Sequence, residues 1–180
     1  MAKKTILSVV ILVFVVIGAL FFIAREPGTG SRQSSKVIAE GGSAPDFHVT
    51  TLDGRSVSLS AFKGKVVMVH FWATWCPPCV EEIPTLDRLY RTFFGKDLEI
   101  LAVSVDDNVQ AVGSFVRKYG LSLPVYLDPE RSSANLYGTF KFPETYLIDR
   151  GGVVRSKTIG ARDWSSPDSI QYVQSLLDKK

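Results

Sequence analysis

The distribution of apolar and polar positions divides the chain into three parts. Residues 6–24 form an apolar run without a charged residue, which at helical rise spans roughly 28 Å, close to the hydrocarbon thickness of a bilayer. Residues 25–42 are rich in Gly, Ser, Pro and charged residues, a composition typical of a flexible linker. Residues 43–180 carry alternating strand-like and helix-like patterns that predict one folded domain.

Within residues 43–180, apolar runs of strand length alternate with segments of helical periodicity. Val66–Trp72 is a near-continuous apolar run, which favours a strand buried on both faces of a mostly parallel sheet. After Cys79, apolar residues recur at spacings of three and four and predict a helix. The other predicted elements are, in chain order, a hairpin of strands 47–51 and 56–59, a strand at 98–105, a helix from 107 or 108 to 119, a strand at 125–127, a helix at 132–137, a hairpin of strands 145–148 and 153–159, and a helix at 167–177. This order predicts an α/β domain whose sheet has helices on both faces.

The net positive charge of the chain comes from its N-terminal segment. Lys3, Lys4 and Arg25 account for the whole net charge of +3, since no acidic residue precedes residue 26 and the remainder is balanced. A neutral domain removes the main reason to expect a nucleic-acid partner. Lys3 and Lys4 favour a cytoplasmic location for residues 1–5, with the domain after the apolar run on the periplasmic or exterior side.

A cleaved signal peptide is the alternative interpretation of residues 6–24. Signal peptides have apolar cores of about 7–15 residues and a small-residue cleavage site, and no A-x-A pattern precedes Arg25. No cysteine near this end could carry a lipoprotein anchor. An uncleaved membrane anchor is therefore favoured, and both interpretations deliver the same extracytoplasmic domain.

Both cysteines of the chain lie in one C-x-x-C motif, Cys76-Pro77-Pro78-Cys79. The motif follows a predicted buried strand and begins a predicted helix, and prolines suit the first turn of a helix. Unpaired N–H groups and the positive end of the helix dipole lower the pKa of a thiol at such a position. Cys76 is therefore the predicted nucleophile, exposed at the helix tip. Cys79, one turn later, lies beneath it and can resolve a mixed disulfide.

The motif has three other interpretations. A structural zinc site needs four ligands, and the chain adds only His48 and His70 to its two cysteines. A purely structural disulfide across so short a loop gains little closure entropy. Free buried thiols suit the cytoplasm better than the compartment that the anchor implies. A redox-active Cys76–Cys79 disulfide, without a metal or another cofactor, is the favoured interpretation.

The string Phe71-Trp72-Ala73-Thr74-Trp75-Cys76-Pro77-Pro78-Cys79, followed by Glu82, Pro84 and Leu86, resembles the thioredoxin-like proteins of the TlpA, ResA and CcmG group. These are membrane-tethered thiol–disulfide oxidoreductases of the bacterial cell envelope. A second match, Phe142–Asp149, lies far away in the sequence. The resemblance covers residues 44–177. It implies a thioredoxin-like fold with a central mixed sheet, an N-terminal β-hairpin and a central insertion between residues 105 and 137.

The resemblance also implies roles for residues around the cysteines. Pro143 would be the cis-proline beside the disulfide, although it could be an ordinary proline at the start of a strand. Glu82 would aid proton transfer to the thiols, with a solvated glutamate paired with Arg88 as the alternative. Glu144 would be catalytic or select partners, or would be a simple charge on an edge strand. The expected docking surface consists of Trp75, Pro77, Pro78, Phe142 and Glu144, and the bulky Phe142, where relatives often carry a smaller residue, could narrow the choice of partners.

The function implied is the reduction of disulfides in envelope proteins such as apocytochrome c during cytochrome c maturation, with a membrane thiol donor returning the electrons. A peroxiredoxin-like thiol peroxidase is the first alternative, but Ala73 and Val69 stand where those enzymes need Thr or Ser and Pro. A copper chaperone of the Sco kind is the second, but it uses C-x-x-x-C and a distal histidine, and no histidine follows His70.

Four further side chains could have a catalytic, metal-binding or partner-binding role, but each also has a structural explanation. His70 lies in the predicted buried strand and is expected to be a packed core residue. Asp106 and Asp107 resemble a metal-binding pair, but helix capping explains them better. Trp164 suits either a surface contact or the core.

Overall fold

A mixed sheet of seven strands organises residues 38–179, the part of the chain that this computed structural model describes. The strand order is β2-β1-β5-β4-β3-β6-β7. The strands are β1 (His48–Thr51), β2 (Ser56–Ser58), β3 (Val66–Trp72), β4 (Leu98–Ser104), β5 (Val125–Leu127), β6 (Glu144–Ile148) and β7 (Val154–Ile159). The three central strands β3, β4 and β5 run parallel, whereas β6, β7, β1 and β2 join their neighbours in antiparallel pairs.

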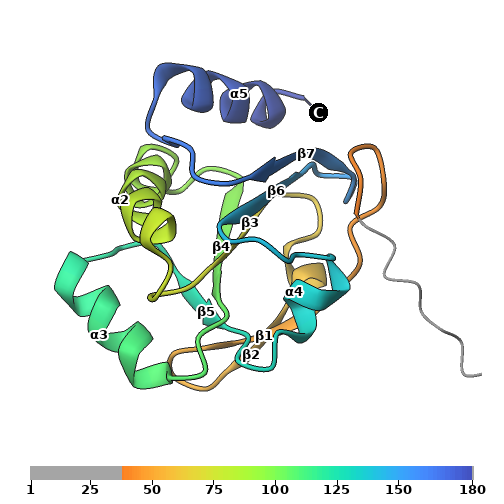
Figure 1. Ribbon diagram of the computed structural model, residues 1–180. Coiled ribbons are helices and arrows are strands. Elements are labelled where there is room, and N and C mark those ends of the chain that lie inside the picture. Colours follow the sequence, from red (N-terminus) through yellow and green to blue (C-terminus); the bar gives the residue numbers. More distant parts are fainter. Residues whose placement is uncertain (1–37, 180) are drawn as a thin grey trace, which may run out of the picture. The chain divides into compact units, whose positions relative to one another are not determined.

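The apolar run of β3 places this strand at the centre of the fold. Each of its residues is buried, because β4 pairs with it on one side, β6 pairs on the other, and helices cover both faces (Figure 1). Neighbouring side chains of β3 alternate between the two faces. Phe71 packs against Tyr137 on one face, and Trp72 packs against Phe115 on the other.

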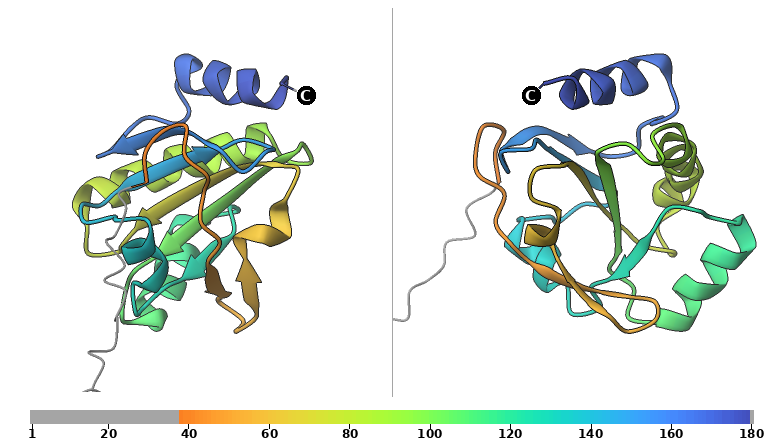
Figure 2. Two further views of the ribbon diagram at one scale, coloured as in Figure 1. Left: turned by 90° about the vertical axis from the view of Figure 1, so that its right-hand side faces the viewer. Right: turned by 180° about the vertical axis from the view of Figure 1, so that it is seen from behind.

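Four α-helices and one 3₁₀ helix, η1, cover the sheet. They are η1 (Leu59–Phe62), α2 (Pro77–Thr92), α3 (Val109–Tyr119), α4 (Ser132–Leu136) and α5 (Pro167–Leu177). The crossovers β3-α2-β4 and β4-α3-β5 advance across the sheet in the same direction, so right-handed connections place α2 and α3 on one face. α4 and η1 lie on the opposite face, and α5 lies beside the β6–β7 end of the sheet in all three views (Figures 1 and 2).

Every strand and helix predicted for the domain is present, within one or two residues of the predicted ends. The helix η1 was not predicted, because four residues are too few to show a periodicity. The cap of α3 is Asn108, whose side chain accepts a hydrogen bond from Ala111 N at 3.2 Å. Of the two expected caps, Asp107 and Asn108, the second is therefore confirmed. Helix capping is wrong as the explanation of Asp106 and Asp107, and Asp106 has other partners described below.

The boundary between linker and domain lies earlier than the predicted residue 43. Gly41 and Gly42 exchange backbone hydrogen bonds with Val154 of β7, at 2.8 and 2.9 Å. Glu40 accepts a bond from Lys157 N at 3.0 Å, and Ile38 packs against the core. The sequence did not indicate that this segment belongs to the domain. Gly41 and Gly42 are held by backbone hydrogen bonds, which leave no apolar pattern in the sequence.

The predicted cytoplasmic residues 1–5, the predicted anchor at residues 6–24 and most of the predicted linker lie outside the described residues. Between residues 38 and 179, none of the helices is both long enough and apolar enough to cross a bilayer.

Candidate active site

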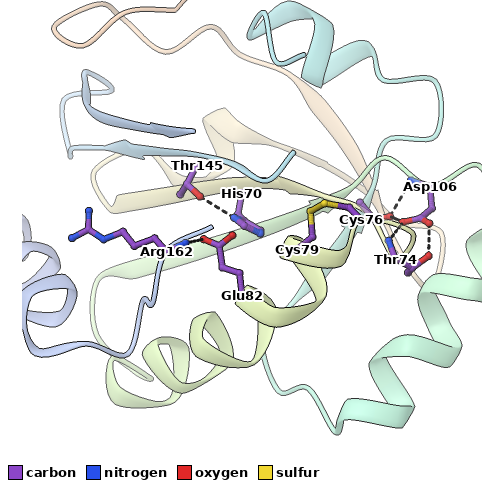
Figure 3. Close-up of a disulfide and its surroundings, with 9 residues drawn as sticks. His70, Thr74, Cys76, Cys79, Glu82, Asp106, Thr145 and Arg162 are labelled. Carbon is purple, nitrogen blue, oxygen red and sulfur yellow. Dashed lines mark hydrogen bonds between the residues drawn. A yellow bond between two sulfur atoms is a disulfide. The ribbon is translucent and has the colours of Figure 1, made fainter. Parts of the chain in front are cut away.

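A disulfide joins Cys76 and Cys79 where β3 passes into α2 (Figure 3). Cys76 is the N-cap residue of α2, with extended backbone angles, and Pro77 and Pro78 begin the helix. Proline is suited to this turn because it has no N–H group to leave unpaired. A reduced Cys76 sulfur therefore stands at the positive end of the helix dipole, where a thiolate is stabilised.

Cys79 is more deeply buried than Cys76, as expected. Cys79 is inaccessible to solvent, and Cys76 is 6% exposed. The prediction of an exposed Cys76 is too strong for this oxidised form, because its sulfur is turned inward to bond Cys79. An external thiolate that attacks this disulfide can reach only the Cys76 sulfur.

Asp106 fixes the segment that leads into the cysteines. Its carboxylate accepts hydrogen bonds from the backbone N of Thr74 at 2.9 Å and from Thr74 Oγ1 at 2.5 Å. Ser104 Oγ donates a third bond at 2.7 Å. Asp106 follows β4, the parallel neighbour of β3, so the carboxyl ends of two adjacent strands meet here. This role of Asp106 could not be found from spacing alone.

Glu82 lies buried beneath the cysteines, two helical turns after Cys76, and is only 2% exposed. Its Oε1 accepts hydrogen bonds from the indole Nε1 of Trp164 and from the backbone N of Arg162, the latter at 3.3 Å (Figure 3). Burial raises the pKa of Glu82 to about 7, against the lowering effect of these two bonds. The alternative of a solvated glutamate paired with Arg88 is wrong, since Arg88 is exposed and Glu82 is not. An acid poised between its two protonation states suits proton transfer at neutral pH.

Pro143 directly precedes β6 and follows a cis peptide bond from Phe142, as the resemblance implied. Its neighbour Glu144 pairs with Phe71 of β3, so Pro143 lies at the same edge of the sheet as the C-x-x-C motif. The carbonyl of Pro143 accepts a hydrogen bond from Gly160 N at 2.8 Å. The Phe142 ring meets the Trp75 ring edge-on, with centroids 6.1 Å apart.

Glu144, expected on the docking surface, is instead fully buried. Its Oε1 forms an ion pair with Lys157 Nζ at 2.8 Å and accepts hydrogen bonds from Tyr146 Oη and Thr139 Oγ1. The strand β6 lies between β3 and β7, so Glu144 is not a charge on an edge strand. Because Glu144 is inaccessible to solvent, it cannot contact a partner in this structure. Its contacts instead connect Thr139, in the segment before Phe142, with Tyr146 of β6 and Lys157 of β7.

The remaining expected docking residues lie around the cysteines at the surface. Trp75 is 56% exposed, Pro77 and Pro78 are exposed, and Phe142 is half-buried. Two further residues were not predicted: Phe140, which is 79% exposed and lies two residues before Phe142 in the chain, and Arg131, whose guanidinium lies 5.8 Å from the centre of the Trp75 ring. Trp75, Phe140 and Phe142 are called the aromatic rim below. Their exposure could not be read from the sequence, because residue type alone does not distinguish them from buried aromatic residues such as Phe71 and Trp72.

Among residues 38–179, no group of three or more His, Cys, Asp or Glu side chains is arranged to hold a metal ion.

Comparisons with known proteins agree with this geometry. Residues 41–157 match the model of the AhpC/TSA family. The chain is 36% identical over 160 residues to the thiol-disulfide oxidoreductase ResA of Bacillus thuringiensis (strain Al Hakam), which covers 89% of this chain and 91% of that protein. The chain belongs to the AhpC/TSA family, among the ResA-like thiol-disulfide oxidoreductases.

A second ResA sequence and a solved structure are also similar to this chain. The ResA of Geobacillus kaustophilus (strain HTA426) is 38% identical over 139 residues, which is 77% of this chain and 79% of that one. A crystal structure from Chlorobium tepidum, described as a thiol:disulfide interchange protein DsbE, is 30% identical with a TM-score of 0.72, and covers 78% of this chain and 99% of its own. The thioredoxin-like fold and the thiol–disulfide oxidoreductase activity implied by the sequence are therefore confirmed, and the substrates of such an activity are proteins.

Proposed function

We propose that this oxidoreductase is an anchored disulfide reductase of the bacterial cell envelope, in which residues 6–24 span the membrane. The domain from residue 38 onward would face the periplasm or the cell exterior. The uncharged run after Lys3 and Lys4 supports this orientation. The observation that carries the chemistry is the Cys76–Cys79 disulfide above a buried acid, Glu82, whose pKa is raised to about 7.

The reaction proceeds in two exchange steps. The Cys76 thiolate attacks one sulfur of a disulfide in the partner, which forms a mixed disulfide and releases the other partner sulfur as a thiolate. The Cys79 thiol gives its proton to the Glu82 carboxylate, and the Cys79 thiolate attacks the Cys76 sulfur. This step forms the Cys76–Cys79 disulfide and releases the second partner thiolate. Two electrons pass to the partner, and a membrane thiol donor returns two electrons to the cysteine pair.

The substrates we propose are oxidised cysteine pairs in extracytoplasmic proteins, with apocytochrome c as the first candidate. The haem-attachment motif of that protein is a short C-x-x-C-H segment. The aromatic rim suits a short, accessible segment better than a buried disulfide, because its side chains Trp75 and Phe140 project into solvent. The sequence Pro143-Glu144-Thr145 supports the cytochrome c maturation branch of the resemblance.

Trapping with Cys79→Ser tests the proposal. This variant keeps the nucleophile and lacks the resolving thiol, so it should accumulate a mixed disulfide between Cys76 and an oxidised C-x-x-C-H peptide. Cys76→Ser is the matched control, which we expect to trap nothing. A Cys79→Ser protein that traps neither this peptide nor any protein from envelope extracts would contradict the proposed exchange.

The direction of electron flow has its own test. A reductant should have a reduction potential well below that of DsbA, at about −120 mV, and nearer to that of thioredoxin, at about −270 mV. Equilibration of the full chain with glutathione and dithiothreitol buffers measures this potential. A value close to that of DsbA would assign the protein to disulfide formation instead.

A thiol peroxidase is the second candidate, since the AhpC/TSA family model itself covers residues 41–157. Peroxidatic chemistry needs a hydroxyl three residues before the reactive cysteine, and Ala73 supplies none. Ala73 and Val69 are both fully buried in the core. We therefore expect no catalytic consumption of hydrogen peroxide, and turnover in that assay would favour the peroxidase.

A further inference from the structure

His70 is a buried titratable residue that the exchange reaction, as written above, does not use. It lies in β3, six residues before Cys76, and is inaccessible to solvent. Because side chains alternate along a strand, His70 points to the same face of the sheet as Trp72. That face is covered by α2 and α3, so the imidazole lies beneath the helix that carries Cys79 and Glu82.

The hydrogen bonds around His70 leave one nitrogen free. Nδ1 lies 2.9 Å from Oγ1 of Thr145, its partner in the β3–β6 pairing. Nε2 is buried and has no hydrogen-bond partner, and the same is true of Oε2 of Glu82. Figure 3 shows the His70 ring between Glu82 and Cys79, with the second carboxylate oxygen of Glu82 turned toward the ring. Two unpaired polar atoms thus share one buried space, although buried polar groups are normally paired.

The protonation states of the two groups are complementary. Burial lowers the pKa of His70 to about 3, so the imidazole is neutral and keeps one bare nitrogen. Burial raises the pKa of Glu82 to about 7, so both protonation states of its carboxyl group are accessible near neutral pH. A neutral acid facing a neutral base places no uncompensated charge in the core, whereas an ionised Glu82 does.

The other groups around this pair are almost all uncharged. β6 contributes Thr145, β7 contributes its partner Thr158, and β4 contributes Ala102, which is paired with His70. The segment before α5 contributes the Trp164 indole and a charged residue, Arg162. The Arg162 side chain donates to Ser169 Oγ at 2.9 Å and lies over the Trp164 ring, so it is not an ion-pair partner of Glu82. The free indole Nε1 of Trp72 belongs to a ring that packs on Phe115 of α3.

We propose that His70 is a positioning residue for the reaction: its Nδ1–H donates to Thr145 Oγ1, and its bare Nε2 accepts a hydrogen from Oε2 of Glu82 once that carboxyl group is protonated and turns toward the ring, a bond that the two unpaired atoms do not make in the structure described here. The proposal rests on the proton-transfer role of Glu82 in the proposed function. His70 itself exchanges no proton. It stabilises the protonated form of Glu82, which is the form left after Cys79 has given up its thiol proton.

In this arrangement a buried residue, His70, influences the transfer of the proton from Cys79 to Glu82 in the resolving step. Before the step, the proton is on Cys79 and Glu82 is ionised. After the step, the proton is on Glu82 Oε2, the Cys76–Cys79 disulfide has formed and the partner has left as a thiolate. An acceptor that favours the protonated carboxyl group therefore favours the products of this step, without affecting the first attack by Cys76.

Two matched substitutions separate the two nitrogens of the ring. His70→Asn places an amide atom near the position of Nδ1, keeps the contact with Thr145 and removes the acceptor at Nε2. His70→Gln reaches the position of Nε2. In the oxidised full chain, with ¹³C-labelled glutamate, NMR titration of the Glu82 carboxyl group measures its pKa. We expect His70→Asn to lower that pKa by about 1 and His70→Gln to restore it, since a lost hydrogen bond to the protonated form has this size.

A merely structural role predicts a different result. If His70 only fills space and excludes water, its replacement leaves the pKa of Glu82 unchanged or alters it equally in both variants. ¹⁵N NMR of the imidazole gives a second readout, because we expect the proton on Nδ1, and a proton on Nε2 would overturn the proposal. In partner kinetics, His70→Asn should slow the resolving step at pH 7 by up to about tenfold and leave mixed-disulfide formation unchanged. Because the NMR readouts need no partner, a failure to trap one leaves this test intact.

Discussion

The indole N–H of Trp164 donates a hydrogen bond to the buried carboxylate of Glu82, although 82 positions separate the two residues in the chain. Trp164 is fully buried and lies in the segment between β7 and α5. That segment therefore closes the space beneath the cysteines and sets the electrostatic environment of the acid. Trp164 belongs to the core, and its polar group belongs to the candidate active site.

Replacing Trp164 by Phe should raise the pKa of Glu82 above its value of about 7. Phenylalanine keeps most of the apolar contact but cannot donate to Oε1, so the ionised carboxylate loses one of the bonds that favour it. NMR titration of the Glu82 carboxyl group checks the shift. A pKa that stays the same or falls would show that this bond does not stabilise the anion.

Replacing Glu82 by Gln should change how stability depends on pH. The folded-state pKa is raised from 4.5 to about 7, so the wild type loses stability as the pH rises through this window, whereas the variant does not. We expect Glu82→Gln to be more stable than the wild type at pH 8 by up to about 3 kcal/mol, and to lose most of this advantage at pH 4. Urea unfolding of both oxidised proteins at the two pH values measures the difference. An advantage that is equal at both values would contradict burial as the cause of the raised pKa.

Replacing Asp106 by Ala should destabilise the domain by about 2–4 kcal/mol, since it leaves the donors of Thr74 and Ser104 unpaired in a buried site. Asp107→Ala is the matched control, because that neighbouring acid is exposed, and we expect a change within about 0.5 kcal/mol. Denaturant unfolding gives both values. Similar losses for the two variants would mean that the bonds of Asp106 carry little of the stability.

Replacing Lys157 by Met should cost about 3–5 kcal/mol, because it leaves the buried Glu144 carboxylate without its cation. Adding Glu144→Gln to this variant should recover part of the loss, since the double variant buries no charge. Thermal or urea unfolding of the single and double variants forms a double-mutant cycle. Strictly additive losses would show that the ion pair contributes no coupling.

Replacing Trp75 by Ala should weaken capture of the partner with little change in stability, because Trp75 is 56% exposed. An aromatic side chain at the centre of a docking surface typically contributes about 2 kcal/mol or more to binding, roughly a thirtyfold change in affinity. Phe94→Ala is the matched control, since Phe94 is 73% exposed and lies at the end of α2 remote from the cysteines. Both variants are compared by the rate of mixed-disulfide formation in the Cys79→Ser background. Equal effects would exclude a specific role for the aromatic rim.

The local features of this protein were predictable from its sequence because each depends on neighbouring residues. The apolar run of β3 has the length of a strand buried on both faces, and prolines after Cys76 suit the start of a helix. The C-x-x-C spacing itself brings two sulfurs together, so the disulfide needed no knowledge of the fold. The resemblance supplied Pro143 and Glu82, which no local pattern distinguishes from other prolines and glutamates.

Only the tertiary structure decided the surroundings of these residues, because burial and hydrogen bonding arise between segments far apart in the chain. The pKa of Glu82 is raised because its burial outweighs the lowering effect of the hydrogen bonds from Trp164 and Arg162. Glu144 lies in the interior because Lys157 of β7 compensates its charge. Asp106 reaches Thr74 because β3 and β4 are adjacent and parallel. The sequence thus determined which atoms can exchange a disulfide, and the packing of distant segments decided how their protons and charges are held.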